Sequence, residues 1–560
     1  MTDTADPFRV TTIDVRGVPT NVFAGAPPHL RAIWESSAVH ADRTYLVYES
    51  ERLDYATAHR DVAILADRMT RDFGIVQGDR ISIAMRNYPE WAIAAWATFA
   101  VGAVLVPMNA WWTGPELAYG LQHSGSVLLF ADDERIERLN GLLAETSIRR
   151  VVRVRSHRSI DDQVEALDWP DVTALETDAP VPQIASVTID PDDDATIMYT
   201  SGTTGRPKGA VATHRNFTAF LMNLLHRTAL AAAATPADPS APPPPPPATL
   251  LTFPLFHVGG LQSFLMPYTV FGGKIVLMYK WDVDVAIDLI DGEQVTAVAG
   301  VPTTVFQLLD VAASKGRSLD SLGAISSGAT LVPPELVRRI DQQFTSRAAP
   351  TNGYGLTETS GAAIANGGRE YLERPDSVGL PISPVMEVRI ADPSTGDSVA
   401  TGEVGEIWLK GPTVVRGYYD NPEATAESFV DGWFRTGDLG RLDDEGYLYV
   451  VDRLKDVVIR GGENIYAAEV EAALYEHPDV VEAAIIGVPH ERLGEEVGAV
   501  VRRKPGSSLS AADVRAHVGA RLAGFKVPTA VWVVEDELPR NATGKVLKRE
   551  LRDTYAAATT

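Results

Sequence analysis

The chain of 560 residues contains no cysteine. Disulfide bonds, zinc–thiolate sites and a cysteine nucleophile are therefore excluded. A reducing compartment fits this composition, so we expect a cytoplasmic location.

Basic residues are also scarce relative to acidic ones. Lys and Arg number 50 against 74 Asp and Glu, which gives a net charge of −24. Such a surface disfavours non-specific binding of nucleic acid and polybasic attachment to anionic lipid. A phosphate-bearing ligand would have to meet a local cluster of positive charge.

Long apolar segments are missing as well. The N-terminal MTDTADPFRV has neither a basic region nor an apolar core, so we expect no secretory signal. The longest uncharged apolar run, residues 91–109, is borderline for a membrane span and is interrupted at Gly102 and Pro107. We interpret it as a buried helix followed by a short core strand.

What is present is typical of a globular protein, with 45% hydrophobic and 22% charged residues. At about 150 residues per domain, the length corresponds to three to four folding units, although fewer large ones are equally allowed. Residues 1–28 are expected to form an irregular lead-in. From Leu30 to about 130, helical patterns alternate with short apolar runs at 81, 104 and 127, and the alternation returns at 250–310. This rhythm predicts an α/β domain with largely parallel strands.

Three later segments differ in composition. Residues 231–248 are rich in alanine and proline and predict an exposed, polyproline II-like loop, with a ligand for a proline-binding module as the alternative. Residues 385–452 contain short strands between Gly-rich turns and predict a small antiparallel unit. After about 453, the order helix, strand, strand, helix predicts a compact α+β module.

The strongest local motif is TIMYTSGTTGRPKGA at 196–210. An apolar strand runs into a loop whose glycines allow close backbone approach, whose hydroxyls and amides donate to anionic oxygens, and whose lysine adds a charge. The loop is not a Walker A motif, because its lysine follows a proline and precedes a glycine. The alternative to a triphosphate site is a solvated turn. The loop residues are Ser201, Gly202, Thr203, Thr204, Gly205 and Lys208.

This loop resembles the signature of the adenylate-forming superfamily, which includes acyl-CoA synthetases, luciferases and peptide-synthetase adenylation domains. Six further segments follow in the superfamily's order and extend the resemblance over nearly the whole chain. They are FPLFHVGG at 253, SSGATL at 326, NGYGLTET at 352, WFRTGDLG at 433, DRLKDVVIRGGENIY at 452 and PRNATGKVLKR at 539.

The resemblance implies a reaction that joins a carboxylate to the α-phosphate of ATP and releases pyrophosphate. It assigns Tyr354 to stacking on adenine, Thr357 to a phosphate, and Glu358 to catalysis and to Mg²⁺, which prefers hard oxygen ligands. Thr200 is assigned to the nucleotide and, together with Glu358, to the metal and to catalysis. Taken alone, Glu358 could be a surface residue beside a Gly-rich turn. The resemblance adds Gly328, Ala329, Asn352, Gly353 and Gly355 to the nucleotide site.

Asp438 resembles the residue that chelates the ribose diol, a role that a carboxylate also plays in dinucleotide folds; a turn cap is the alternative. The segment at 326 resembles a loop along the adenine, but it has Ser327 where many relatives have glycine. His257 resembles a catalytic histidine near the acyl carboxylate, against the alternative of a core histidine. The eleven histidines show no close metal-ligand spacing, so no zinc site is expected.

Three cations near the C-terminus complete the site. Arg453 resembles a nucleotide-contacting arginine, and Lys455 lies at the superfamily's hinge beside Asp452, although both could belong to a charged linker. Lys545 resembles the catalytic lysine that reaches the acyl carboxylate and phosphate, where its charge would stabilise the pentavalent transition state. The alternative is a basic C-terminal run.

We therefore predict an α/β protein with a large N-terminal AMP-binding domain at 1–452, built of several subdomains, and a small, mobile α+β domain at 453–560. The predicted enzyme uses ATP and Mg²⁺ to form an acyl-adenylate and transfers the acyl group to coenzyme A. The small domain would rotate about Lys455, and Gly461 and Gly462 would leave room for a pantetheine arm next to Asn464.

Several alternatives remain open. The acceptor could be a separate carrier protein, or the chain could be a luciferase-like oxygenase. It could also be a nucleotide-binding regulator, although the presence of Lys208, Glu358, Asp438 and Lys545 counts against lost catalysis. Stretches at 256–267, 301–307 and 359–366 predict a hydrophobic acid that is fatty, branched, aryl or sterol-derived. The oligomeric state is open, with a homodimer as one candidate.

Overall fold

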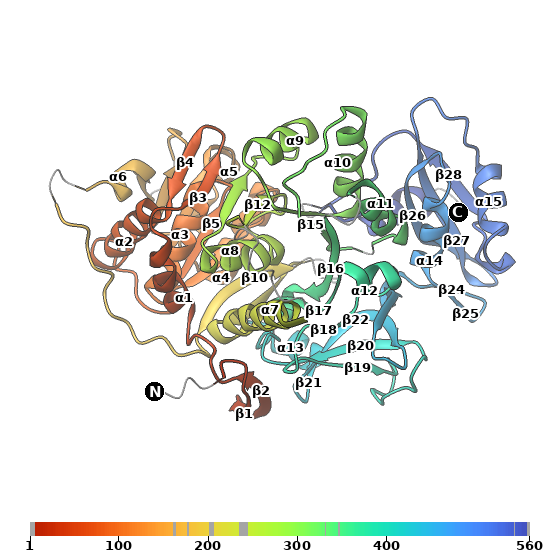
Figure 1. The fold of residues 1–560 in the computed structure, drawn as a ribbon, viewed down its shortest axis with the longest axis horizontal. Coiled ribbons are helices and arrows are strands. Elements are labelled where there is room, and N and C mark those ends of the chain that lie inside the picture. Colours follow the sequence, from red (N-terminus) through yellow and green to blue (C-terminus); the bar gives the residue numbers. More distant parts are fainter. Residues whose placement is uncertain are drawn as a thin grey trace.

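The computed structural model describes residues 6–160, 164–175, 179–200, 206–234, 245–330, 332–344, 348–541 and 544–556. The first α/β unit and the C-terminal unit lie at opposite ends of the molecule, with a second α/β unit and an antiparallel sheet between them (Figure 1).

The first unit is built on a seven-stranded sheet in the order β11-β10-β6-β5-β7-β8-β9, parallel except for the β10–β11 pair. The runs predicted at 81, 104 and 127 are confirmed as β5, β6 and β7. The strands are β5 (Arg80–Ala84), β6 (Val104–Pro107), β7 (Leu128–Asp132), β8 (Arg150–Val154), β9 (Glu165–Asp168), β10 (Asp194–Thr200) and β11 (Lys208–Thr213).

Helices cover this sheet because each has an apolar face to bury. The predicted buried helix before β6 is confirmed as α3, which is buried at every position except Glu90. The helices of this unit are α1 (Leu30–Ser36), α2 (Tyr55–Arg71), α3 (Pro89–Ala100), α4 (Gly114–Ser124), α5 (Asp133–Leu139) and α6 (Trp169–Thr173).

The second unit contains a nine-stranded sheet in the order β18-β17-β16-β15-β14-β12-β13-β3-β4, parallel from β16 to β3. The runs predicted at 250–310 are confirmed as β12, β13 and β14. The strands are β3 (Thr44–Tyr48), β4 (Glu51–Asp54), β12 (Ala248–Leu251), β13 (Lys274–Leu277), β14 (Ala297–Gly300), β15 (Ala324–Gly328), β16 (Ala349–Leu356), β17 (Gly361–Gly367) and β18 (Leu380–Pro381).

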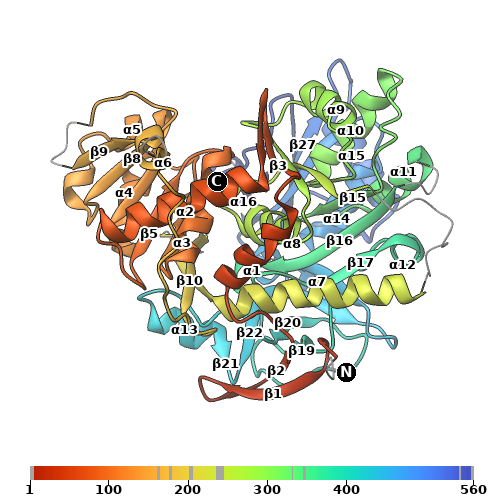
Figure 2. The same cartoon turned by 60° about the vertical axis from the view of Figure 1, so that its left-hand side comes forward.

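One face of this sheet packs against α9 (Val283–Gly292), α10 (Pro302–Ser314) and α11 (Pro334–Phe344) around a common apolar core. The other face carries the π-helix η3 (Gly259–Leu265) and α8 (Met266–Val270). The long helix α7 (His214–Ala234) runs beside β16 and β17 towards α12 (Gly368–Glu373) (Figure 2).

The predicted antiparallel unit is a five-stranded sheet in the order β19-β20-β22-β21, with β23 paired to β22. Its strands are β19 (Glu387–Ala391), β20 (Gly405–Lys410), β21 (Phe429–Val430), β22 (Trp433–Leu442) and β23 (Leu448–Arg453), and helix α13 (Pro422–Ser428) precedes β21.

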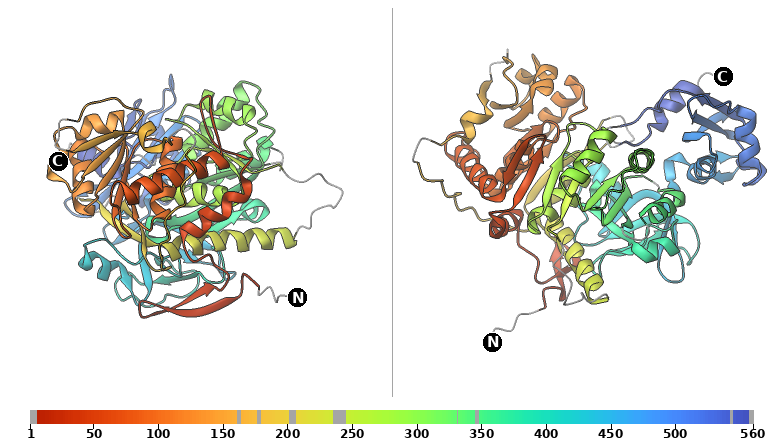
Figure 3. Two further views of the ribbon diagram at one scale, coloured as in Figure 1. Left: turned by 90° about the vertical axis from the view of Figure 1, so that its left-hand side faces the viewer. Right: turned by 45° about the horizontal axis from the view of Figure 1, so that its top comes forward.

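The C-terminal unit stands apart at one end (Figure 3). The predicted order helix, strand, strand, helix is confirmed as α14 (Ala467–Tyr475), β26 (Val480–His490), β27 (Gly494–Arg503) and α15 (Ala511–Gly519). The sheet also holds β24 (Val458–Arg460), β25 (Glu463–Ile465) and β28 (Ala530–Val534), and α16 (Lys548–Leu551) follows. The change of sheet after Arg453 lies beside the expected domain boundary, which stays a prediction.

Two predictions about loops were wrong in part. The described residues of the lead-in are not irregular, because β1 (Val10–Val15) and β2 (Val18–Phe23) form a hairpin whose turn has positive φ at Arg16 and Gly17. The Pro-rich loop is shorter than 231–248, since alanine favours helix and α7 continues to Ala234, while Ala248 already belongs to β12. Residues 235–244 lie outside the described residues.

None of the helices in the described part of the chain has the length and apolar character needed to cross a membrane.

Candidate active site

The candidate site lies where carboxyl ends of parallel strands meet the antiparallel sheet and a loop of the C-terminal unit. His257 follows β12, Gly328 ends β15, and Glu358 follows β16 in the short 3₁₀ helix η4 (Thr357–Thr359). Ligand sites of α/β sheets form at this edge. The motif segments, although far apart in the sequence, therefore reach one region of the fold.

The signature loop joins two antiparallel strands. β10 ends at Thr200 and β11 begins at Lys208, and the Thr200 hydroxyl donates to the Lys208 carbonyl at 3.4 Å. The predicted strand before the loop is confirmed. The predicted loop residues Ser201, Gly202, Thr203, Thr204 and Gly205 lie outside the described residues.

A buried carboxylate faces the end of this hairpin. The Tyr418 hydroxyl donates to Glu358 Oε1 at 2.9 Å, and Lys208 Nζ lies 5.1 Å from the centre of the Tyr418 ring. Burial raises the pKa of Glu358, although Tyr418, Arg453 and Lys208 act in the opposite direction. A nearby divalent cation would favour the ionised carboxylate. Because Mg²⁺ commonly binds one or two carboxylates together with substrate phosphates, the chemistry of Glu358 fits the predicted ion.

Tyr418 was missed by the sequence analysis. It lies beside β11, 60 residues after its partner Glu358. No local sequence pattern indicates that Glu358 is buried and needs a hydrogen-bond donor.

A second cluster joins β16 to β22 and β23. The Tyr354 hydroxyl donates to Asp438 Oδ2 at 2.9 Å, and Arg453 Nε lies 3.3 Å from Asp438 Oδ1. Burial and the adjacent Asp438 raise the pKa of Tyr354, so its phenol remains a donor. The buried carboxylate of Asp438 is thus held in place by two donors that come from different strands.

The backbone between these clusters is open. Gly353 and Gly355 are exposed although they lie on an inner strand, and a Cβ at Gly355 would collide with the Gly361 carbonyl. Gly328 pairs with Gly353, Ser327 pairs with the nearly buried Asn352, and Ala329 adopts a positive φ of 64°. Only small residues fit this edge, which leaves room for a flat ligand.

Lys545 reaches this region from the C-terminal unit. A Cβ on the preceding Gly544 would lie 3.0 Å from Val301 Cγ2, at the start of α10. Burial and the neighbouring Arg453 lower the pKa of Lys545 to about 7, with Asp438 acting in the opposite direction. Burial and then Lys545 lower the pKa of His257 to about 4, so this imidazole is neutral at pH 7. The structure therefore brings Lys545, His257, Asp438 and Arg453 together.

Other predicted residues lie elsewhere. Gly461 and Gly462 form the β24–β25 turn with positive φ of 60° and 93°, and Asn464 follows on β25. All three are exposed, on an edge of the C-terminal unit that faces away from β15 and β16 (Figure 1). Lys455 is exposed in the 3₁₀ turn η5 (Leu454–Asp456), directly after Arg453.

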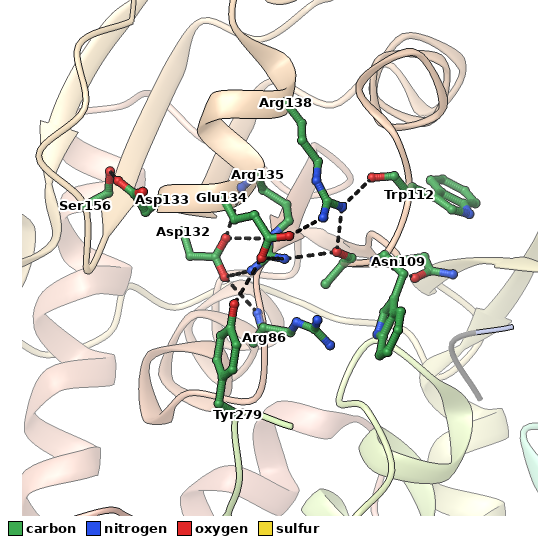
Figure 4. Close-up of polar contacts among 12 residues, drawn as sticks. Arg86, Asn109, Trp112, Asp132, Asp133, Glu134, Arg135, Arg138, Ser156 and Tyr279 are labelled. Carbon is green, nitrogen blue, oxygen red and sulfur yellow. Dashed lines mark hydrogen bonds and ion pairs between the residues drawn. The ribbon is translucent and has the colours of Figure 1, made fainter. Parts of the chain in front are cut away.

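A buried ion network supports the site from the first unit (Figure 4). Arg135 makes two bonds to Asp132, and Glu134 accepts from Tyr279, which follows β13. The backbone amide of Arg86 donates to Asp132 Oδ2 at 3.1 Å, so the network ties β5 to β7 and to the second sheet.

Asn87, the residue after Arg86, links this network to the loop that leads to His257. Asn87 Nδ2 donates to the Phe253 carbonyl at 3.0 Å, and Asn87 Oδ1 accepts from the Leu255 amide at 2.8 Å. Both bonds hold the loop that leads to His257. The sequence analysis missed this connection because its partners lie more than 160 residues apart.

The pKa of Lys545 leads to a pH prediction. If the charged amine is required for adenylation, kcat/KM for ATP should fall above about pH 7, because kcat/KM reports the free enzyme. In Lys545→Arg this fall at high pH should disappear, since a guanidinium stays charged. The measurement is the rate of pyrophosphate exchange from pH 6 to 9. If the fall at high pH persists in Lys545→Arg, the titration of another group causes it.

Comparison with known proteins finds two family models that match this chain. Residues 33–419 match the family model described as AMP-binding enzyme, and residues 469–545 match the AMP-binding enzyme C-terminal domain. A feruloyl-CoA synthase of Amycolatopsis sp is 38% identical over 504 residues, which cover 90% of this chain and 94% of that protein.

Further relatives carry other substrate names. A 2-succinylbenzoate–CoA ligase of Bacillus velezensis is 34% identical over 91% of this chain and 95% of its own length. A long-chain-fatty-acid–CoA ligase of Bacillus subtilis is 32% identical, covering 92% of each chain.

The fold is shared with solved structures. The o-succinylbenzoate CoA synthetase of Bacillus subtilis, in complex with its acyl-adenylate intermediate, is 28% identical with a TM-score of 0.77, covering 94% of this chain and 98% of that one. The same enzyme has been solved with ATP and a magnesium ion. The predicted fold class is confirmed, and the chain is an enzyme that belongs to the AMP-binding family of the adenylate-forming superfamily, as its motifs predicted.

Proposed function

We propose that this enzyme is an AMP-forming acid–CoA ligase that activates a carboxylic acid with Mg-ATP and passes the acyl group to coenzyme A. The observation that carries the proposal is the convergence of Lys545 and His257 with the Asp438–Arg453 pair. It supports the proposal because adenylation would need a cation beside the residues that we assign to the acid and the ribose.

The first half-reaction must bring two anions together. The carboxylate oxygen attacks the α-phosphorus while the bond to the pyrophosphate oxygen breaks, so catalysis consists mainly of charge neutralisation and in-line positioning. Lys208 would meet the departing phosphates, and Lys545 would stabilise charge on the carboxylate and α-phosphate. Neutral His257 would line the carboxylate's path without adding charge.

The nucleotide would lie along the open edge formed by Gly328, Ala329 and Gly353–Gly355, with Thr357 near the phosphates. Asp438 would accept hydrogen bonds from the two ribose hydroxyls. Its carboxylate is fixed in position by Arg453 and Tyr354. Mg²⁺ would bind at Glu358, with Thr200 at the loop edge, and when bound would neutralise phosphate charge. Glu358 is oriented for this by Tyr418.

The second half-reaction needs a different arrangement. The turn with Gly461 and Gly462 is exposed and faces away from the strand ends, so a thiol route past it requires rotation of the C-terminal unit. Lys455 and its neighbours, between the last strand of one sheet and the first of the next, are the proposed hinge.

The acyl group would lie between η3 and the nine-stranded sheet. On the face opposite the α9–α11 core, β14, β15 and β16 present small side chains, whereas β12 and β13 present Leu251 and Leu277. Several of the small positions are only half-buried, although their strands lie inside the sheet. They are Ala297, Ala324, Ser326, Gly328 and Thr351. We propose this space as the acyl cavity.

The finer substrate class, including a fatty acid, is a proposal, because the relatives named above act on aromatic, succinylbenzoate and fatty substrates. A carrier protein is the alternative acceptor. The homodimer and the cytoplasmic location stay predictions.

Exchange of labelled pyrophosphate into ATP, measured with a panel of organic acids, tests the first half-reaction. We expect exchange that depends on both acid and Mg²⁺. Dependence of AMP release on free coenzyme A then tests the acceptor, and AMP release that requires an acyl carrier protein would favour the alternative. A nucleotide-binding regulator would bind ATP without exchange under any of these acids.

A further inference from the structure

The first unit has a cavity that the proposed reaction does not use. Its volume is about 660 Å³, which is within the range of small-molecule sites. The lining residues come from the β1–β2 turn, from positions at or just before the starts of β5, β6 and β10, and from Arg416 and Tyr419 in the segment beside β11. None of them belongs to the candidate active site, so this cavity has no role in adenylation or thioester formation.

The cavity lies at the edge of the seven-stranded sheet opposite to the one that carries the nucleotide loop. Arg80, Val104 and Asp194 are the first residues of β5, β6 and β10, and because these strands are parallel, their amino ends meet here. Thr200, next to the nucleotide loop, is at the other end of β10, about 20 Å away for a strand of seven residues. A ligand in the cavity is therefore distinct from the nucleotide.

Two arginines that line the cavity have no carboxylate partner among the described residues. All three guanidinium nitrogens of Arg80 donate to backbone carbonyls, at 2.9 to 3.1 Å. Arg16 is exposed and donates to the Asp192 carbonyl at 2.6 Å. These carbonyls hold both guanidiniums in position without neutralising their charge, and further N–H groups of both side chains remain available to a ligand.

The carboxylates of the cavity are mostly neutralised by other arginines. Asp192 accepts two bonds from Arg215, at 2.7 and 2.8 Å, and Asp194 accepts two from Arg416, at 2.6 and 2.7 Å. Asp193 accepts from a side-chain amide and a backbone amide, and has no basic partner within the described ranges. Two arginines without a carboxylate thus stand against one carboxylate without a cation. The cavity carries an excess of positive charge, although the protein has a net charge of −24.

The backbone at Arg16 adds to this argument. Arg16 and Gly17 form the two-residue turn of the β1–β2 hairpin, and both have positive φ, of 54° and 82°. Such turns favour Asn, Asp or Gly, and other side chains are strained there. Strained residues cluster at ligand sites. In this hairpin the strained position places a guanidinium in the lining of the cavity.

We infer that this cavity is a binding site for a phosphate-bearing small molecule, separate from the catalytic site. A phosphate group carries nearly two negative charges and three acceptor oxygens, so it can bind Arg16 and Arg80 together, whereas a single carboxylate is matched by one guanidinium. The bound phosphate supplies the counter-charge that both arginines lack. The inference goes beyond the proposed function and does not depend on it.

Isothermal titration of the full chain tests the class of ligand. The probes are ribose 5-phosphate, inorganic phosphate and ribose, which has no phosphate, all at one ionic strength. We expect at least one of the two phosphate compounds to bind and ribose not to bind. Tighter binding of ribose 5-phosphate indicates a phosphate ester as the ligand, and tighter binding of inorganic phosphate indicates the free ion. If neither phosphate compound binds, or if ribose binds as tightly as its phosphate, the inference is wrong.

Arg16→Gly tests the location of the site. Glycine adopts positive φ without strain, so the hairpin should be retained, while the affinity for the phosphate compound should fall by about tenfold to a hundredfold. Arg9→Ala, at an exposed arginine just before the same hairpin and outside the cavity, is the matched control and should keep the affinity.

Lys208→Ala separates the cavity from the nucleotide loop. Because Lys208 lies at the far end of the β10–β11 hairpin, this variant should bind the phosphate compound as the wild type does. Loss of binding in Lys208→Ala together with unchanged binding in Arg16→Gly would place the phosphate at the nucleotide loop and overturn the inference.

Discussion

Lys545→Ala is expected to slow adenylation on the order of 10²–10³-fold while sparing thioester formation from supplied acyl-adenylate. The ammonium group lies beside His257 and the Asp438–Arg453 pair, and the C-terminal loop that carries it packs against Val301. Removing it takes away one preorganised cation at the point where, in the proposed reaction, carboxylate and phosphate charges would meet.

The two half-reactions separate this role from a general defect. In the second one, the proposed rotation removes Lys545 from the site, so its loss should leave transfer to coenzyme A intact. Arg549→Ala, at an exposed basic residue four positions further on, is the control and should change neither step. Single-turnover formation of acyl-adenylate and, separately, its conversion to thioester are measured. Equal loss in both steps would contradict the assigned role.

The motifs were predictable from the sequence because their segments resemble those of the adenylate-forming superfamily and follow its order. His257, Gly328 and Glu358 all lie just after or at the end of strands of one sheet, and parallel strands place such ends together. The resemblance to the adenylate-forming superfamily therefore implied a common site, whereas the apolar runs by themselves predicted only an α/β fold.

Partners that come from distant segments could not be predicted. Tyr418 reaches Glu358 only because the chain after β20 passes β11, and Asn87 reaches the Phe253 loop because two sheets meet.

The buried ion network is where a single substitution should affect stability most. The Arg135 side chain is 0% exposed and bonds to both oxygens of Asp132, to Glu134 Oε2 at 2.9 Å and to the Ala110 carbonyl at 3.1 Å. Burial disfavours its charge, but the bonds to Asp132 raise the pKa of Arg135 above its ordinary value. Arg135 therefore stays charged in the folded protein, with the Asp132 carboxylate as its partner.

Arg135→Met should lower the free energy of unfolding of the first unit by about 3–5 kcal/mol, because it leaves the carboxylate of Asp132 buried without its counter-charge. Two backbone amides, of Arg86 and Arg135, would remain as donors to that carboxylate. Urea unfolding followed by tryptophan fluorescence measures the shift. Arg369→Met, at an exposed pair with Glu373, is the control and should change the midpoint little.

The double variant Asp132→Asn with Arg135→Met distinguishes an uncompensated charge from lost packing. Asparagine removes the buried charge and keeps an acceptor for the two amides, so the double variant should be more stable than Arg135→Met alone. If the double variant is no more stable than Arg135→Met, the loss of stability comes from the missing volume and contacts of the arginine. The uncompensated charge of Asp132 is then not its cause. Because Arg86 precedes Asn87, which holds the loop before His257, recovery of stability should be accompanied by recovery of the adenylation rate.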